Sequence, residues 1–487
     1  MFNIPFFCEY FLSRCRHVDT NVNKLTALHH ATWNNCKEIA ELLISHGACL
    51  DVKAEYGKTP LHYAVEFNCK ETAEVLISHG ANINEKDDSG KTALHFAAIK
   101  NCKEIIELLI SHSANINEKD NYGKTALHIA AEYNSKETVE LLISHGANIN
   151  EKDNYGETAL HLATEYNCKE TVEVLISHGA NINAKDKSGE TVLQIATDEN
   201  CKEAAEVLIS HGANINEKDS YRQTALHIAT IKNRKEITEL LISHSANINE
   251  KDNYGKTALH IAAEYNSKET VELLISHGAN INEKDNYGET ALHLATEYNC
   301  KETVEVLISH GANINAKDKS GETVLQIATD ENCKEAAEVL ISHGANINEK
   351  DSYRQTALHI ATIKNRKEIT ELLISHSANI NEKDNYGKTA LHIAAEYNSK
   401  ETVELLISHG ANINEKDKNR KTAIHHAAQK NNKEIVEVLI SHGANINVKD
   451  KSGETALQIA TNENCKEAAE VLISHGAKIN NRPACSI

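Results

Sequence analysis

The 487-residue sequence lacks any long hydrophobic run. A helix needs roughly 18 to 20 consecutive apolar residues to span a bilayer, and no stretch of this chain approaches that length. The N-terminus has no basic segment ahead of a clean apolar core, so it does not resemble a secretory signal. We therefore expect no membrane span and a cytoplasmic protein, with the nucleus as the alternative compartment.

An excess of positive charge is also absent, because 51 basic side chains face 70 acidic ones and the formal net charge is −19. A protein that binds nucleic acid needs a basic footprint to neutralise phosphates, and no such footprint is visible in the sequence. Nucleic acid is therefore not an expected partner. We interpret the acidic excess as a solvated face that keeps the protein soluble.

Motifs of catalysis and cofactor binding are missing as well. The sequence contains no nucleophile elbow, phosphate-binding loop, dinucleotide-binding glycine pattern or separate pair of carboxylates. Its 28 histidines and 12 cysteines match neither H-E-x-x-H nor a Cys/His zinc pattern. Since most of these residues recur periodically, whereas a site is local, we predict a protein that is not an enzyme and holds no cofactor or metal.

What the sequence does contain is one unit repeated at a fixed spacing. The threonine of a T-A-L-H element recurs every 33 residues without insertion, at Thr26, Thr59, Thr92, Thr125, Thr158, Thr191, Thr224, Thr257, Thr290, Thr323, Thr356, Thr389, Thr422 and Thr455. A fixed period of this size indicates a solenoid, in which stacked neighbours bury the apolar face that a single unit leaves open.

One copy carries the full motif T-P-L-H-x-A, from Thr59 to Ala64. With the period of 33, this motif resembles the ankyrin-repeat family. The resemblance implies an all-α solenoid of stacked helix-turn-helix units with projecting β-hairpin loops. It also implies that the motif histidine, such as His128, forms a hydrogen bond between units. The chain has only three prolines, and most copies have Ala or Val at the motif proline, as at Ala126 and Val192.

The unit at 121–153 can also be interpreted residue by residue. Thr125 is expected to cap a short first helix that Asn134 ends in a left-handed conformation. A second helix is expected from Lys136, with Gly146 just past its end. Residues 153–156, Asp-Asn-Tyr-Gly, have the composition of a turn and are expected to form the tip of the projecting hairpin.

The predicted organisation has three segments. Residues 1–21 form a degenerate half-repeat or a leader, residues 22–480 form a solenoid of 14 repeats, and residues 481–487 form a tail. Residues 121–252 and 253–384 are identical, and 385–417 repeats 121–153 once more. No polar capping repeat is recognisable at the C-terminal end, so self-association there is a candidate interaction.

Cysteine recurs at one repeat position: Cys36, Cys69, Cys102, Cys168, Cys201, Cys300, Cys333 and Cys465. Neighbouring repeats are about 10 Å apart, which is too far for a disulfide. Because Ser135, Arg234 and Asn432 replace the cysteine elsewhere, we interpret the position as a small turn residue.

Tyrosine points to a partner surface, because 13 of 15 tyrosines occupy two repeat positions, the hairpin tip and the inner helix. Tyrosine is common at interfaces, since it offers a large contact area and a polar group at low entropic cost. The resemblance implies that variable residues at these positions select the partner. The candidate partner-binding residues are Asn121, Tyr122, Glu132, Tyr133, Tyr155, Glu165, Tyr166, Tyr254, Tyr265, Tyr287, Tyr298, Tyr386 and Tyr397.

The predicted function is a non-catalytic scaffold that binds one or more proteins, through segments with basic residues, on an extended concave surface. The alternative for the tyrosines is that they pack hairpin against helix between repeats. Alternative functions are an elastic or spacer element, and a targeting subunit for an enzyme in another chain.

Overall fold

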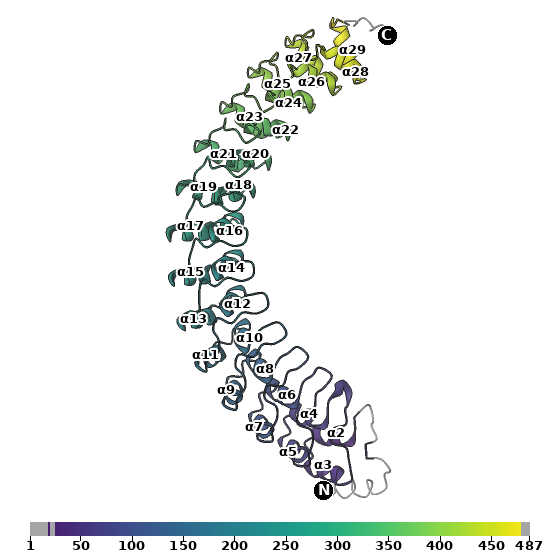
Figure 1. Cartoon of the computed structure of the whole chain (residues 1–487), viewed down its shortest axis with the longest axis vertical. Coiled ribbons are helices and arrows are strands. Elements are labelled where there is room, and N and C mark those ends of the chain that lie inside the picture. The colour runs from purple at the N-terminus through teal and green to yellow at the C-terminus, as the bar shows by residue number, and fades with distance from the viewer. Residues whose placement is uncertain (1–17, 20–24, 479–487) are drawn as a thin grey trace. The chain divides into compact units, whose positions relative to one another are not determined.

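The computed structural model describes residues 18–19 and 25–478, in two compact parts, Met1–Asn247 and Ile248–Ile487 (Figure 1). We describe each part by itself. Most of the predicted half-repeat at 1–21 and the whole of the predicted tail at 481–487 lie outside the described residues.

Each repeat holds a seven-residue first helix and a nine-residue second helix. In the first part the helix pairs are α2 (Ala27–Trp33) and α3 (Lys37–Ser45), α4 (Pro60–Glu66) and α5 (Lys70–Ser78), α6 (Ala93–Ile99) and α7 (Lys103–Ser111), α8 (Ala126–Glu132) and α9 (Lys136–Ser144), α10 (Ala159–Glu165) and α11 (Lys169–Ser177), α12 (Val192–Asp198) and α13 (Lys202–Ser210), and α14 (Ala225–Ile231) and α15 (Lys235–Ser243). A 3-10 turn, η1 (Glu55–Gly57), precedes α4.

The second part has the same arrangement. Its helix pairs are α16 (Ala258–Glu264) and α17 (Lys268–Ser276), α18 (Ala291–Glu297) and α19 (Lys301–Ser309), α20 (Val324–Asp330) and α21 (Lys334–Ser342), α22 (Ala357–Ile363) and α23 (Lys367–Ser375), α24 (Ala390–Glu396) and α25 (Lys400–Ser408), α26 (Ala423–Gln429) and α27 (Lys433–Ser441), and α28 (Ala456–Asn462) and α29 (Lys466–Ser474).

Each first helix begins at a capping box built from the threonine and the histidine of the motif. The backbone N–H of Thr125 donates to Nδ1 of His128 at 3.1 Å, so Nδ1 is an acceptor and the proton is on Nε2. That Nε2 donates to the carbonyl oxygen of Glu157 in the next repeat at 3.2 Å. Burial lowers the pKa of His128, which keeps the ring neutral as this geometry requires. The predicted cap and the predicted bond between repeats are both confirmed.

Where glutamine replaces the histidine, the amide makes the same two bonds. Oε1 of Gln194 accepts from the Thr191 backbone N–H at 2.8 Å, and Nε2 donates to the carbonyl oxygen of Gln223 at 2.7 Å. An amide has one fixed donor end and one fixed acceptor end, so it reproduces the Nε2–H tautomer of the imidazole.

The helix ends also follow the sequence. Asn134 has φ of 53° between the two helices, and Gly146 has φ of 92° after the second. The N–H of Ala147 donates to the carbonyl of Leu142 and that of Gly146 to the carbonyl of Ile143, both at 3.0 Å, which is a Schellman motif. Each repeat therefore reverses direction twice at residues that tolerate left-handed backbone.

The core lies between the two helices of a repeat and between neighbouring repeats. Leu127 and Ala130 from α8 pack with Val139 and Leu142 from α9, and all four are at most 1% exposed. Burial of one leucine side chain contributes on the order of 2 kcal/mol. In each part, first helices pack on the first helices of neighbouring repeats and second helices on second helices (Figure 1).

The connection between repeats is a turn rather than a regular hairpin. Oδ1 of Asp153 accepts from the N–H groups of Tyr155 and Glu157 at 2.8 and 3.0 Å, which closes the tip. Isolated β-bridges join Lys185 to Thr191 and Lys317 to Thr323, and no described residue lies in an extended strand. The chain is therefore an all-α repeat solenoid, as predicted, with projecting turns that contain little β-structure.

Asparagines join successive turns in a ladder that the sequence analysis did not anticipate. Oδ1 of Asn117 accepts from the backbone N–H of Asn148 in the next repeat at 2.8 Å. The same bond, across 31 residues, recurs along both parts, for example from Asn313 to Asn282 at 2.7 Å. The second asparagine of each A-N-I-N sequence is thus a structural residue.

The cysteine position needs a correction. It is the N-cap of the second helix, and its side chain reaches back to the end of the preceding first helix, as Cys201 Sγ does to the carbonyl of Glu165 at 3.7 Å. Arg234 donates to the carbonyl of Asp198 at 2.8 Å, and Asn432 to that of Ala395 at 2.7 Å. The position therefore takes donors of very different size, not only a small residue.

Candidate interaction surface

The hairpin tips are joined to one another through their backbones. The N–H of Asn154 donates to the carbonyl of Tyr122 in the preceding tip at 2.9 Å, and that of Lys187 to the carbonyl of Tyr155 at 2.9 Å. The backbone groups of the tips are thereby satisfied, while the Tyr122 and Tyr155 side chains are 55% and 58% exposed. The tips present a row of aromatic rings on a fixed backbone.

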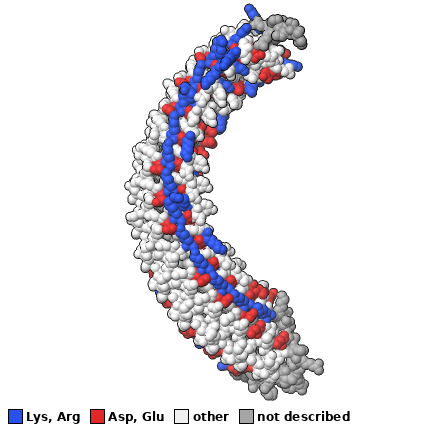
Figure 2. Space-filling model, viewed as in Figure 1, with Lys and Arg blue, Asp and Glu red and all other residues white. Residues whose placement is uncertain are grey.

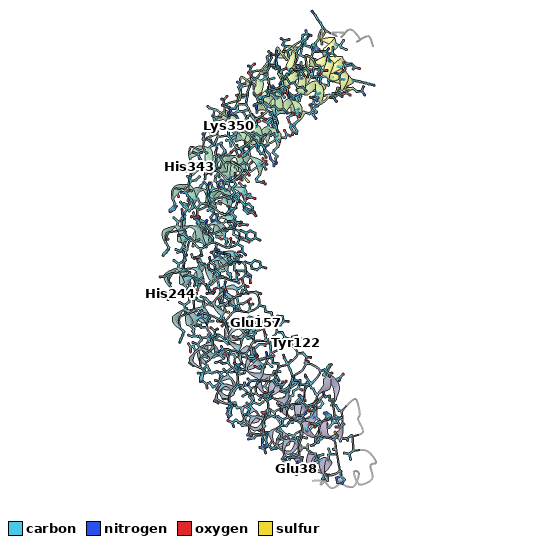
Figure 3. All side chains as sticks on the ribbon, viewed as in Figure 1. Glu38, Tyr122, Glu157, His244, His343 and Lys350 are labelled. Carbon is cyan, nitrogen blue, oxygen red and sulfur yellow. The ribbon has the colours of Figure 1, made fainter. Side chains whose placement is uncertain are left out.

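The first part brings four of the predicted residues together. Tyr122, Glu132, Tyr133 and Tyr155 line one cavity of about 330 Å³. Tyr133 is the C-cap residue of α8 and not a residue within the helix, and its ring is 56% exposed. In Figure 3, Tyr122 projects on the side opposite His244, which follows a second helix.

A lysine of the same repeat, Lys124, lines this cavity. Lys124 follows the hairpin glycine, and its Nζ lies 2.7 Å from Oε2 of Glu132 at the end of α8. The predicted acidic residue therefore already has a counter-charge from its own chain.

Asn121 does not belong to the cavity. Its side-chain Nδ2 donates to the carbonyl of Asp88 at 3.0 Å, and its backbone N–H donates to the carbonyl of Ser89 at 3.0 Å. These bonds hold one tip against the preceding one, so they give Asn121 a structural role that the sequence did not reveal.

The next cavity along the first part contains a residue that the sequence analysis missed. Predicted residues Tyr155, Glu165 and Tyr166 line about 390 Å³ together with Glu157. Burial, Asp153 and Glu165 raise the pKa of Glu157 from 4.5 to about 7. The signal in the sequence is the change from G-K-T at 123–125 to G-E-T at 156–158, with a glutamate eight residues further on in both repeats.

The second part repeats both arrangements. Lys256 pairs with Glu264 at 2.7 Å, and burial, Asp285 and Glu297 raise the pKa of Glu289 to about 7. The predicted tyrosines of this part, Tyr254, Tyr265, Tyr287, Tyr298, Tyr386 and Tyr397, are all between 54% and 67% exposed.

One cavity in the second part has its own composition. Tyr386, Glu396, Asp417 and His426 line about 480 Å³. His426 replaces the aliphatic residue of most other repeats, and its Nε2 lies 3.0 Å from Oδ2 of Asp417. Oδ2 of Asp417, the aspartate of the hairpin turn, therefore points toward the first helix of its own repeat.

Lysines gather in a line along the turns of each part, a pattern that the sequence analysis did not detect (Figure 2). Nζ of Lys86 lies 2.6 Å from Oε1 of Glu118 and 2.8 Å from the carbonyl oxygen of Lys119, and the pattern continues from repeat to repeat. Lys350, labelled in Figure 3, pairs with Glu382 in the same way. Glutamates hold the ammonium groups of most of these lysines, so much of the line is a ladder of ion pairs. Lys152 and Lys284 have alanine at the glutamate position, and their Nζ donates to the carbonyl oxygens of Lys185 and Lys317.

Within residues 18–19 and 25–478, no group of three or more His, Cys, Asp or Glu residues is arranged to hold a metal ion. The cysteines within these described residues are free thiols. None of the helices in the described range is both long and apolar enough to cross a membrane.

Comparison with known families gives one match. A family model described as ankyrin repeats (3 copies) matches residues 2–87, 81–153, 149–219, 217–285, 280–351, 349–417 and 410–483, which together cover nearly the whole chain. A search of curated proteins finds no match.

Proposed function

This chain belongs to the ankyrin-repeat family, and from that premise we propose that it is a non-catalytic scaffold that binds protein partners on its hairpin tips and first helices. Ankyrin repeats are generally protein–protein interaction modules, and proteins built from them are typically non-catalytic. The proposal concerns this chain's own surface and the kind of partner that fits it.

The observation that supports the proposal is the exposed row of tyrosines. Rings that only packed hairpin against helix would be largely buried, whereas Tyr133 and Tyr166 are 56% and 53% exposed and line cavities. Their backbone is held by bonds within and between repeats, so a partner can bind with little ordering of the chain. The net charge of −19 favours partner segments with basic residues.

The test replaces Tyr133, Tyr166, Tyr265 and Tyr298 together with serine in the intact chain. Partners captured by the unchanged chain are identified by mass spectrometry and then measured with the variant. We expect at least a tenfold loss of affinity with an unfolding midpoint close to that of the unchanged chain. A matched control replaces four exposed glutamates of second helices with serine: Glu137, Glu170, Glu269 and Glu302.

Unchanged affinity with reduced stability would show that the rings only pack between repeats, and would refute the proposal. Deletion of residues 253–384 separates a scaffold from a spacer, because that block is an exact copy of 121–252. A scaffold with redundant sites retains binding at lower avidity, while a spacer loses function in proportion to length.

A further inference from the structure

The residue after the hairpin glycine sets the charge of each cavity on the tyrosine surface. In four repeats it is a lysine whose ammonium binds a carboxylate eight residues later in the same repeat. These ion pairs are Lys58–Glu66, Lys124–Glu132 and Lys256–Glu264 at 2.7 Å, and Lys388–Glu396 at 2.6 Å.

In two repeats this lysine is replaced by glutamate while the glutamate eight residues later is retained. Two further repeats have glutamate followed by aspartate, at Glu190 and Asp198 and at Glu322 and Asp330, but there the aspartate pairs with Lys232 or Lys364. Glu157 takes the place of Lys124, and Glu165 takes the place of Glu132. Neither side chain forms an ion pair or a hydrogen bond with any described residue that the structure records. The substitution therefore removes the lysine of that repeat and leaves two carboxylates without an ion pair at the cavity.

The turn aspartate of the same repeat, Asp153, has one carboxylate oxygen without a partner. Asp153 is 6% exposed, and its Oδ2 is buried with no hydrogen-bond partner. The equivalent Asp120 lines the neighbouring cavity, and the equivalent Asp417 directs its Oδ2 to His426 on the first helix of its repeat. By the equivalence of the repeats, Asp153 Oδ2 is directed toward Leu162, which corresponds to His426 and lines the cavity.

The same three features recur once in the second part, at Glu289, Glu297 and Asp285. Asp153 and Asp285 are the only turn aspartates of the described residues whose Oδ2 is buried and unpartnered. The two repeats with the pair of glutamates are therefore also the two with the unpartnered aspartate oxygen.

The net shifts of the two glutamate pKa values indicate that the lysines near the cavity compensate these carboxylates only in part, since Lys124 lowers both values without preventing the rise. Burial and then Asp153 raise the pKa of Glu157, and burial and then Glu199 raise that of Glu165. Two lysines line the same cavity, but Nζ of Lys124 is bound to Glu132, and Lys187 is at the next hairpin tip. A cation that entered the cavity would lower the free energy of the ionised forms of both Glu157 and Glu165.

We propose that the cavity of Glu157 and Glu165, and its copy at Glu289 and Glu297, each bind a lysine side chain of a protein partner. The partner's ammonium takes the position that Lys124 Nζ has in the preceding repeat, between the two carboxylates. The rings of Tyr155 and Tyr166 line the cavity and contact the methylene groups and the cation. Two such sites 132 residues apart favour a partner with two lysine-bearing segments.

This inference rests on the proposed function, because the lysine belongs to a protein bound on the same surface. A metal ion fits less well, since the described residues contain no cluster with metal-ligand geometry. Lysine is the occupant with a precedent in the structure, because four repeats fill the same position with their own lysine.

The experiment uses the full chain and a library of nonamer peptides with lysine fixed at the centre and all other positions varied. The same library with the central lysine acetylated on Nζ is screened in parallel. We expect peptides that bind in the first library and bind at least tenfold more weakly when acetylated, with two peptides per chain by calorimetry. A centre of arginine in place of lysine tests whether a guanidinium is accepted.

The decisive variant is Glu157→Lys with Glu289→Lys, which restores the chain's own ion pair in both cavities. It is expected to lose at least tenfold in affinity for the selected peptides. The matched control, Glu173→Lys with Glu305→Lys, makes the same charge change on exposed positions of α11 and α19 and is expected to bind within about twofold of the unchanged chain. The lysine variant should fold, because it recreates an ion pair found in four other repeats. A second variant, Glu157→Gln with Glu289→Gln, keeps the shape of the side chains and removes their charge. It is expected to lose at least threefold in affinity for the selected peptides.

Equal binding of acetylated and free peptides, or unchanged affinity in both variants, would overturn the lysine assignment. If the captured partner still depended on the tyrosines in that case, the scaffold function would stand and only this cavity would be excluded. Loss of tyrosine dependence for every partner would instead remove the function on which the cavity assignment rests.

Discussion

The raised pKa values of Glu157 and Glu289 predict an unusual pH dependence of stability. In the folded chain the pKa of Glu157 is about 7, against 4.5 for the unperturbed group. Between these values the folded state binds more protons than the unfolded state, so the free energy of unfolding falls as pH rises from about 4.5 to about 7. Below this pH range the Glu157 carboxyl is neutral and does not destabilise the fold. Above the range it is fully ionised, and the whole loss of stability remains.

The size of this penalty follows from the pKa difference. A rise from 4.5 to about 7 corresponds to roughly 3 kcal/mol at 1.36 kcal/mol for each pH unit. Because Glu157 is half-buried and partly screened by solvent, we expect on the order of 1 kcal/mol. Its copy Glu289 has the same environment, so Glu157→Gln with Glu289→Gln should raise stability by about 2 kcal/mol at pH 8 and by close to zero at pH 4.

A matched control of opposite sign lies six residues away. The hydrogen bond from Lys119, whose Nζ lies 2.6 Å from Oε1, lowers the pKa of Glu151. Glu151→Gln should therefore destabilise the chain at neutral pH, by well under 1 kcal/mol because the pair is exposed, and this effect should disappear as pH falls.

The assay is hydrogen exchange, measured by mass spectrometry on peptides from α10 and α18 at several pH values and corrected for the intrinsic exchange rate. A local measurement is needed because a repeat array does not unfold as a single unit. A stabilisation by the glutamine variant that did not change between pH 4 and pH 8, or a destabilisation at pH 8, would refute the view that burial and neighbouring carboxylates destabilise the ionised forms of Glu157 and Glu289.

Three further substitutions test the scaffold. His128→Gln should leave the free energy of unfolding nearly unchanged, because Gln194 already makes both bonds in its own repeat. His128→Ala should lower it by about 2 kcal/mol, because buried backbone groups lose their partners. Chemical denaturation measures both variants, and equal losses would contradict the proposed bonding. Ser113 has φ of 70° where other repeats have glycine, so Ser113→Gly should stabilise its repeat by up to about 1 kcal/mol, and unchanged exchange protection at α7 would count against strain there. Asn117→Ala should remove one bond of the asparagine ladder and cost about 1 kcal/mol, seen as faster exchange of the Asn148 amide, and an unaltered rate would show that this bond carries little stability.

The sequence predicted several features of the fold residue by residue. Thr125, Asn134 and Gly146 were assigned as cap, turn and helix end, and the structure gives each of them that role. These assignments succeeded because each depends on local backbone preference, and a period of 33 shows the same preference many times over.

The site was only partly predictable. Exposed, recurring tyrosines such as Tyr122 and Tyr133 can be recognised from their spacing alone, but Glu157 cannot, because its importance comes from what it faces. Asn121 has the same sequence signal as its neighbour Tyr122, yet its side chain is bonded to the preceding tip. The lysine ladder was missed because its partners lie one repeat away, in a sequence whose net charge is negative.

By itself, the sequence determined the family, the all-α solenoid and the ends of its helices, because these depend on periodicity and on backbone preferences within a few residues. Only the tertiary structure decided which charges are paired. Lys124 and Glu132 are eight residues apart, and packing of the hairpin against the first helix brings them to 2.7 Å. The same packing brings Glu157 and Glu165 to one cavity that no lysine of their own repeat lines. The energy of a charge depends on distance and burial rather than on its place in the chain.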